Sequence, residues 1–231
     1  MNIERRSLLN ATSPVPAIRV ETRNEDVVVY GRKQKVTRDW CVGYASIFGH
    51  LSLDLGDFVE RIDARAFNRI LEQRDGAMPV EPRALWNHDA NFPLARYPDT
   101  LKLVVDERGL RYEFPFPRSS YGQDLRTNIA DGIVKGSSFG FVVAPGGESW
   151  AVEEGRSVRT VTEVSHLYDV SPTTYPAYPD SDVAVAQRSY DHFRKTISKP
   201  AAKTKATGLL SAAEIRKFIE ERKSKHGGKI R

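Results

Sequence analysis

Residues 134–143 read VKGSSFGFVV, an apolar run in which Ser137 and Ser138 stand between Gly136 and Gly140. The β-branched and aromatic residues of this run predict a β-strand. Glycine weakens a strand and often marks a place where a ligand or another backbone comes close. Two interpretations follow: a strand with solvated serines that enters from a turn, or a strand that presents a nucleophilic serine. The second requires a histidine from elsewhere in the chain as the base.

The rest of the chain combines several short strands with few helices. Segments rich in Val, Tyr, Phe and Thr recur, and some of them alternate apolar and polar residues. Helical signals occur at residues 63–73, which begin with Asp, and at residues 120–131, which are followed by Gly132. This pattern predicts an α+β fold, mainly antiparallel β. The predicted strands are residues 27–30, 40–48, 101–105, 110–116, 138–143 and 159–170.

Charge and composition divide the chain of 231 residues into four parts. From Arg188 to the end there are 13 Lys and Arg against 4 Asp and Glu, whereas the preceding part carries a net negative charge. A nucleic-acid-binding body would carry its basic patch on the fold, so we do not expect one here. The expected parts are an N-terminal arm (1–24), one folded domain (25–187), a basic linker (188–210) and a short amphipathic helix with a basic tail (211–231).

Several classes of protein are excluded by composition. The single cysteine, Cys41, rules out an intrachain disulfide framework and a cysteine-based metal site. No stretch approaches the roughly 18 apolar residues of a membrane span, and the first ten residues lack the apolar segment of a signal peptide. We therefore expect a soluble protein made in a reducing cytoplasm, without membrane contact.

A catalytic serine needs a histidine base and a third group that orients this base. The chain contains His50, His88, His166, His192 and His226. His88 is distinctive because it lies between Asn and Asp at the end of the apolar run ALWNHD. We therefore favour His88 as the candidate base.

Two acidic residues are candidates for the third group. Glu163 and Asp169 lie in the segment RTVTEVSHLYD and are separated by an even number of positions. If that segment is one regular strand, both side chains lie on the same face. From the residues alone, either carboxylate could orient an imidazole.

Six motifs occur in a fixed order over about residues 40–187: GYASIFGHLSLDLGDFVERIDARAF, LWNHD, DERGLRYEF, YGQDL, GSSFGFVV and RTVTEVSHLYDVSPTTYPAYPDSDVAV. Together they resemble the prohead maturation serine protease family of tailed bacteriophages, distant relatives of the herpesvirus capsid-maturation proteases. The ordered set is far more specific than any one of its motifs. The resemblance makes residues 25–187 the protease domain.

The resemblance implies a barrel-like β core flanked by helices, as in the herpesvirus proteases. By the family's motifs, His88 is the base and Ser138 the nucleophile, with Ser137 as a neighbour that points the other way. For the third member the resemblance favours Glu163, with Asp169 as the alternative, because the herpesvirus relatives place theirs at a similar distance after the serine. Glu163 lies 25 positions after Ser138.

The resemblance also implies a setting and partners. The family's enzymes enter the immature capsid from the host cytoplasm, cleave scaffold or the scaffold-like arm of the major capsid protein, digest themselves, and are absent from the mature virion. The class allows a homodimer and requires no metal or organic cofactor. The alternative is a catalytically inactive assembly or scaffolding protein that keeps the fold.

Overall fold

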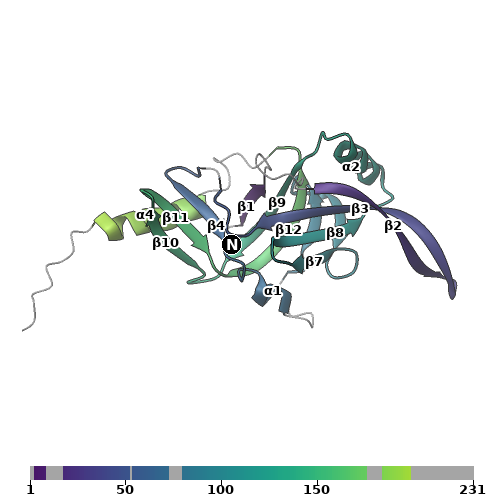
Figure 1. The fold of residues 1–231 in the computed structure, drawn as a ribbon, viewed down its shortest axis with the longest axis horizontal. Helices are drawn as coiled ribbons and strands as arrows, with labels where there is room; N and C mark the ends of the chain where they lie inside the picture. The colour runs from purple at the N-terminus through teal and green to yellow at the C-terminus, as the bar shows by residue number, and fades with distance from the viewer. Residues whose placement is uncertain (1–2, 9–17, 53, 73–79, 176–183, 199–231) are drawn as a thin grey trace, which may run out of the picture. The chain divides into compact units, whose positions relative to one another are not determined.

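The computed structural model describes residues 3–8, 18–52, 54–72, 80–175 and 184–198 (Figure 1). The chain divides into two units, Met1–Asp191 and His192–Arg231. The second unit is described only over the end of helix α4 (Ala184–Ser198). The helix expected within residues 211–231 lies outside the described residues.

Within the described residues of the first unit, twelve strands form three sheets. The five-stranded sheet consists of β1 (Glu4–Leu8), β9 (Gly136–Val143), β12 (Val164–Thr173), β5 (Arg83–Trp86) and β6 (Asp89–Arg96). The four-stranded sheet consists of β2 (Ile18–Val29), β3 (Arg32–Ile47), β8 (Gly109–Pro115) and β7 (Lys102–Val105). The three-stranded sheet consists of β10 (Glu148–Glu153), β11 (Arg156–Val161) and β4 (Phe58–Ile62).

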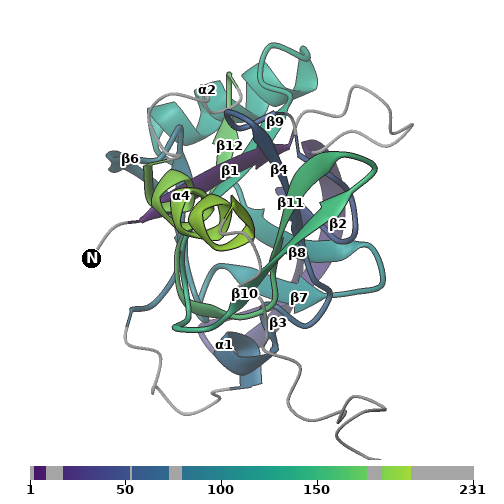
Figure 2. The same ribbon diagram turned by 90° about the vertical axis from the view of Figure 1, so that its left-hand side faces the viewer.

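The fold is mostly β with few helices, as the composition predicts. All strand pairs are antiparallel except β4 with β11 and β5 with β12. The barrel-like core that the resemblance implies is not found as a closed barrel within the described strands. Their hydrogen bonding instead divides them into three open sheets, visible in Figures 1 and 2.

The side chains of strand β9 alternate between an aromatic cluster in the core and the candidate site. Phe139 and Phe141 are buried and stacked with 4.7 Å between ring centroids, and Phe139 also meets the ring of Phe67 edge-on. Since successive side chains of a strand point to opposite faces, Ser138 and Gly140 face away from this aromatic cluster. The strand thus packs one face into the core and offers the other to its neighbours in the site.

Of the two predicted helices, one is found as predicted and the other is shorter. Helix α2 (Ser120–Ala130) confirms the prediction for residues 120–131, and Gly132 follows it with a φ of 70°. The helix predicted at residues 63–73 is shorter, because residues 64–67 form turns and only α1 (Asn68–Glu72) is helical. Turn hydrogen bonds from Ala66 to Asp63 and from Asn68 to Arg65 replace its expected first turn.

The chain ends differ from the expected division into arm and linker. Residues 4–8 form β1, which pairs antiparallel with β9, and β2 already begins at Ile18. Helix α4 continues to Ser198, well into the expected linker. Its first half packs on the three-stranded sheet (Figure 2), where Tyr190 contacts the rings of Phe58 and Trp150. Burial of these rings is the physical reason that the helix forms there.

A buried ionic cluster holds β1 in place. Its members, Glu4, Arg6, Glu60 and Arg159, are each at most 8% exposed. Nη1 of Arg159 lies 2.6 Å from Glu4 Oε2 and 2.7 Å from Glu60 Oε2, and Nε of Arg6 lies 2.6 Å from Glu60 Oε1. The cluster therefore joins β1 to β4 and β11. A charge removed from it would leave a partner buried without compensation.

We expect Glu60→Gln to lower the free energy of unfolding by about 3–5 kcal/mol at neutral pH, the usual cost of breaking a buried pair. Burial alone would raise the pKa of Glu60, but Arg6 and Arg159 hold it below its ordinary value. This stabilisation is complete above the pKa of the unfolded side chain, about 4.3, and is lost as pH falls through the lower folded pKa. Urea unfolding of both proteins between pH 3 and pH 7 measures the difference.

The matched control is Glu153→Gln. Glu153 pairs with Arg61 on the same sheet but is 40% exposed, so its loss should cost less than about 1 kcal/mol. If the Glu60→Gln difference stays constant down to pH 3, or is no larger than that of the control, the cluster does not stabilise the fold in this way.

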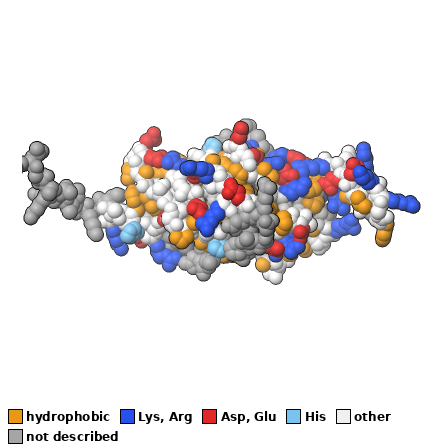
Figure 3. All heavy atoms as spheres, turned by 90° about the horizontal axis from the view of Figure 1, so that it is seen from below, with side chains coloured by type: hydrophobic (Ala, Val, Ile, Leu, Met, Phe, Trp, Pro, Cys, Tyr) orange, Lys and Arg blue, Asp and Glu red, His pale blue; other side chains and the backbone are white. Residues whose placement is uncertain are grey.

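On the face seen in Figure 3, acidic and basic side chains of the described residues are interspersed with apolar ones. None of the described helices is long and apolar enough to cross a membrane.

Candidate active site

A tight turn presents His88. Asn87 and His88 connect β5 to β6 and have positive φ angles of 55° and 59°, the left-handed conformation of a two-residue hairpin turn. The Asn87 N–H donates to the Pro172 carbonyl at 3.0 Å, and Asn87 Oδ1 accepts from the Thr174 N–H at 2.9 Å. These two bonds fasten the turn to the end of β12. The two hydrogen bonds of Asn87 therefore determine the position of His88 relative to β12.

Three side chains from three strands or turns form one chain of hydrogen bonds. His88 Nε2 lies 2.7 Å from Ser138 Oγ on β9, and His88 Nδ1 lies 2.5 Å from Asp169 Oδ1 on β12. A carboxylate can only accept, so Nδ1 carries the proton and Nε2 accepts from the serine hydroxyl. Ser138 is fully buried, and the His88 and Asp169 side chains are 13% and 7% exposed. This arrangement can transfer a proton from a nucleophilic hydroxyl.

A fourth side chain, Ser171, fixes the acid and was not predicted from the sequence. Its buried hydroxyl donates to Asp169 Oδ1 at 2.6 Å. Ser171 is also the register partner of Ser138 on the neighbouring strand. The signal that could have found it is its position two residues after Asp169, which puts both side chains on one face of a strand.

The two adjacent serines have opposite surroundings. Ser137 Oγ donates to the hydroxyl of Tyr112 at 3.1 Å in the core. Burial raises the pKa of Tyr112 well above its ordinary value, so this hydroxyl stays neutral. Of the two serines, only Ser138 is hydrogen-bonded to His88, as the parity of a regular strand predicts.

Glu163 does not make the contact with His88 that the resemblance favoured. Its carboxylate is 40% exposed and accepts from Arg69 Nη1 at 2.6 Å. The predicted strand over residues 159–170 is interrupted, because β11 ends at Val161 and β12 begins at Val164, each in a different sheet. The parity that related Glu163 to Asp169 fails across this break. The structure therefore brings the alternative acid, Asp169, to His88.

Gly140 makes room for the carboxylate of Asp169, its register partner on β12. A Cβ atom built on Gly140 would lie 2.4 Å from Asp169 Oδ2. The sequence predicts a close approach at this glycine, and the structure identifies the approaching group as the acid of the site. Gly136 is similarly restricted, since a Cβ there would lie 2.9 Å from the Thr173 carbonyl oxygen.

We expect Gly140→Ala to lower kcat for the reaction at this site on the order of 100-fold, because the methyl group displaces Asp169 and tilts His88 away from Ser138. The matched control is Gly147→Ala, whose Cβ would lie equally close, 2.4 Å, to the Glu163 carbonyl oxygen, away from the three side chains. Both variants should lose stability, but only Gly140→Ala should lose kcat per folded molecule. Active-site titration with thermal melts separates the two effects, and equal kcat losses would contradict this role of Gly140.

The other candidates lie apart from these contacts. His166 stacks on Tyr168 and its Nδ1 lies 3.0 Å from Ser165 Oγ. Cys41 is buried, and burial raises the pKa of its thiol, so it is not a reactive thiolate. Within the described part of the chain, no group of three or more His, Cys, Asp or Glu side chains could hold a metal ion.

Comparisons with known proteins identify the family of this chain. A family model described as caudovirus prohead serine protease matches residues 27–196. No curated protein matches the chain. Among solved structures, the bacteriophage T4 capsid assembly protease, gp21, is similar with a TM-score of 0.37 and 10% identity, covering 73% of this chain and 98% of that one. A TM-score this low carries no weight for the fold or the activity.

Proposed function

Because the chain belongs to the caudovirus prohead serine protease family, we propose that it is a capsid-maturation endopeptidase whose catalytic residues are Ser138, His88 and Asp169. The observation that supports these roles is the continuous hydrogen-bond chain from Ser138 Oγ through the His88 ring to Asp169. One chain supplies all three side chains.

The proposed reaction proceeds through an acyl-enzyme. His88 Nε2 takes the proton of Ser138 as Oγ attacks the scissile carbonyl, and backbone N–H groups stabilise the oxyanion. The protonated His88 then gives this proton to the leaving amine, and the peptide C–N bond breaks. A water molecule, deprotonated by His88, attacks the ester, and the proton returns to Ser138. Throughout, Asp169 holds the productive tautomer of the ring and stabilises the imidazolium.

Ser171 would act as a positioning residue within this mechanism. Its hydrogen bond to Asp169 Oδ1 leaves the carboxylate one favoured orientation, toward His88 Nδ1. Gly140 supports the same orientation from the neighbouring strand by leaving the space that Oδ2 occupies. The acid would thus be oriented from both strands before substrate binds, which is the condition for efficient proton transfer.

We propose scaffold protein, scaffold-like segments of the major capsid protein, and the protease itself as substrates. The family is one of prohead proteases, and the resemblance of the sequence motifs implies scaffold and capsid protein as the polypeptides cleaved there. Loss of the protease from the mature virion would follow from its self-cleavage. The inactive scaffolding alternative has no support, because the family is one of proteases and the side chains that the chemistry needs are hydrogen-bonded to one another.

The test is to incubate the purified full chain with the capsid and scaffold proteins of its own phage and to identify the fragments by mass spectrometry. The same mixture with Ser138→Ala is the control. We expect defined fragments of at least one of these proteins, and of the protease, only with the unaltered chain. Identical fragments in the control, or none in either mixture, would overturn the proposal.

A further inference from the structure

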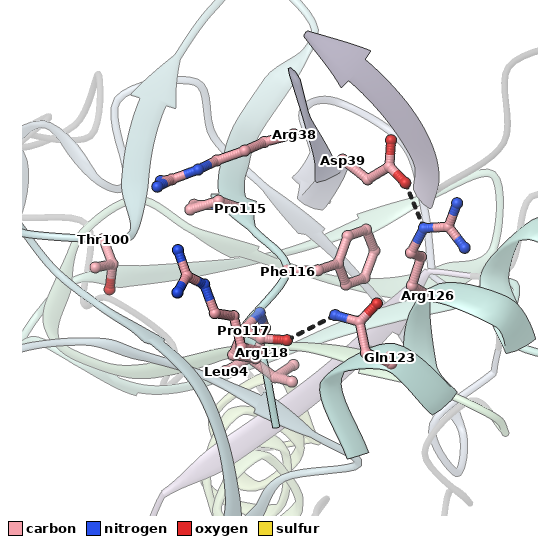
Figure 4. Close-up of a pocket in the computed structure, with 10 residues that line it drawn as sticks. All are labelled: Arg38, Asp39, Leu94, Thr100, Pro115, Phe116, Pro117, Arg118, Gln123 and Arg126. Carbon is pink, nitrogen blue, oxygen red and sulfur yellow. Dashed lines mark hydrogen bonds and ion pairs between the residues drawn. The ribbon is translucent and has the colours of Figure 1, made fainter. Parts of the chain in front are cut away.

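A second candidate site lies in a pocket of about 340 Å³ between β3, the end of β8 and helix α2 (Figure 4). Leu94, Pro115 and Phe116 supply apolar side chains to it. Arg38, Arg118 and Arg126 supply three guanidinium groups. None of these residues belongs to the hydrogen-bond chain of Ser138, His88 and Asp169. The pocket is therefore separate from the proposed catalytic residues.

Among the described residues, only one of the three arginines has an acidic partner. Arg126 forms an ion pair with Asp39, which also accepts from the Thr22 hydroxyl at 2.6 Å. The Thr22 and Arg126 contacts lower the pKa of Asp39, so its charge is committed to this pair. The guanidinium groups of Arg38 and Arg118 have no hydrogen-bond or ion-pair partner among the described residues. The pocket thus carries two uncompensated positive charges.

These two guanidinium groups are placed to act together. Figure 4 shows the ends of Arg38 and Arg118 turned toward the same end of the pocket, while Arg126 and Asp39 lie at the other end. Arg38 is half-buried, so its charge is less well solvated than that of a free surface arginine. Two like charges that converge in a partly buried pocket repel each other unless an anion lies between them.

Helix α2 adds to this positive potential. It begins at Ser120, and its N-cap residue, Ser119, which follows Arg118, makes no side-chain capping bond. No acidic residue lies in its first turn. The positive end of the helix dipole is therefore not neutralised by the helix itself.

We propose that this pocket binds the side-chain carboxylate of an acidic residue in the polypeptide substrate. Planar guanidinium groups bind carboxylates through paired, charge-assisted hydrogen bonds. The apolar side chains of Leu94 and Phe116 suit the methylene groups of such a residue, which a bare inorganic anion lacks. The choice of a polypeptide as the ligand rests on the proposed protease function.

Strand β6 links the pocket to the proposed active site. It begins next to His88 and carries Leu94 near its other end. It is also an edge strand, with β5 as its one partner among the described strands. The ladder between β5 and β6 is irregular here, because the neighbours Leu85 and Trp86 pair with Pro93 and Asp89, so residues 90–92 bulge out of it. A substrate that runs along β6 would therefore reach the pocket with a residue on one side of the scissile bond, a few positions from it.

The first test measures binding alone, in the full chain with Ser138→Ala. The Nε–Hε signals of Arg38 and Arg118 are followed by NMR during titration with N-acetylglutamate amide, N-acetylglutamine amide or inorganic phosphate. We expect these signals to shift with the glutamate probe and not with the glutamine probe. Arg38→Gln with Arg118→Gln should weaken glutamate binding about tenfold or more, as expected for the loss of charge-assisted bonds.

The control removes the same number of charges elsewhere on β3. Lys33 and Lys35 are exposed and do not line the pocket, so Lys33→Gln with Lys35→Gln should bind the glutamate probe as the parent does. If glutamate binding is weakened equally in both double variants, the effect comes from net charge alone, and the proposed carboxylate site is overturned. Phosphate binding without glutamate binding would also overturn it, because the carboxylate would then be the wrong ligand.

A second test uses the active chain and a substrate cleaved in the fragment experiment. Peptides with Glu or Gln at each position within seven residues of the scissile bond are compared by kcat/KM. We expect a preference for Glu at one of these positions, lost in the arginine double variant. Cleavage without any such preference would refute the pocket's role but leave the proposed protease intact. Glutamate binding by a chain that cleaves nothing would refute the protease function instead.

Discussion

Ser138→Ala is expected to lower kcat for peptide cleavage on the order of 10⁶-fold, the size of effect that follows removal of a nucleophile in a serine protease. The fold should survive, because Ser138 contributes a hydrogen bond to His88 and little packing. A quenched peptide that contains an identified cleavage site measures the rate, and circular dichroism monitors the fold. Adding His88→Ala should cause little further loss, since the two residues act as one unit.

Ser137→Ala is the matched control, because it removes a hydroxyl from the adjacent position of the same strand. It deletes the buried bond to Tyr112, so we expect a stability loss of about 1–3 kcal/mol and near-normal kcat. Loss of activity in Ser137→Ala with retention in Ser138→Ala would show that the nucleophile is the other serine. If Ser137→Ala and Ser138→Ala lose comparable kcat, then the loss reflects disturbance of strand β9, and Ser138 is not identified as the nucleophile by this comparison.

Asp169→Asn should lower kcat on the order of 10⁴-fold, the second-largest effect that we expect. An amide in place of the carboxylate can donate to His88 Nδ1, which favours the tautomer with its proton on Nε2. That tautomer cannot accept the proton of Ser138. The variant should keep its fold, because the amide is nearly isosteric with the carboxylate and Gly140 still provides the space beside it.

Glu163→Gln is the control for Asp169→Asn. Glu163 is partly exposed and pairs with Arg69, so its neutralisation should change kcat by less than a few-fold. Rates measured between pH 5 and pH 9 add a second readout, because a group that orients His88 also shifts the pH profile. If Glu163→Gln loses as much as Asp169→Asn, then the acid is not the one that the hydrogen bonds indicate.

Features that depend on a few neighbouring residues could be predicted from the order of the amino acids. The strand around Ser138, the helix over residues 120–131 and the opposite orientations of Ser137 and Ser138 all follow from backbone preferences with a period of two or 3.6 residues. The ordered motifs were also sufficient to identify the protease family, as the family comparison confirms. None of these inferences required knowledge of which strands pair.

The identity of the carboxylate that meets His88 depends on contacts between strands that are distant in sequence. The resemblance favours Glu163 by its distance from Ser138, but a break between β11 and β12 places Glu163 in a different environment. Asp169 reaches the ring because β12 pairs with both β9 and β5, which are far apart in sequence. The same holds for β1, whose Glu4 meets Arg159 across 155 positions. Contacts of this kind depend on long-range strand pairing and burial, which local patterns of residues do not encode.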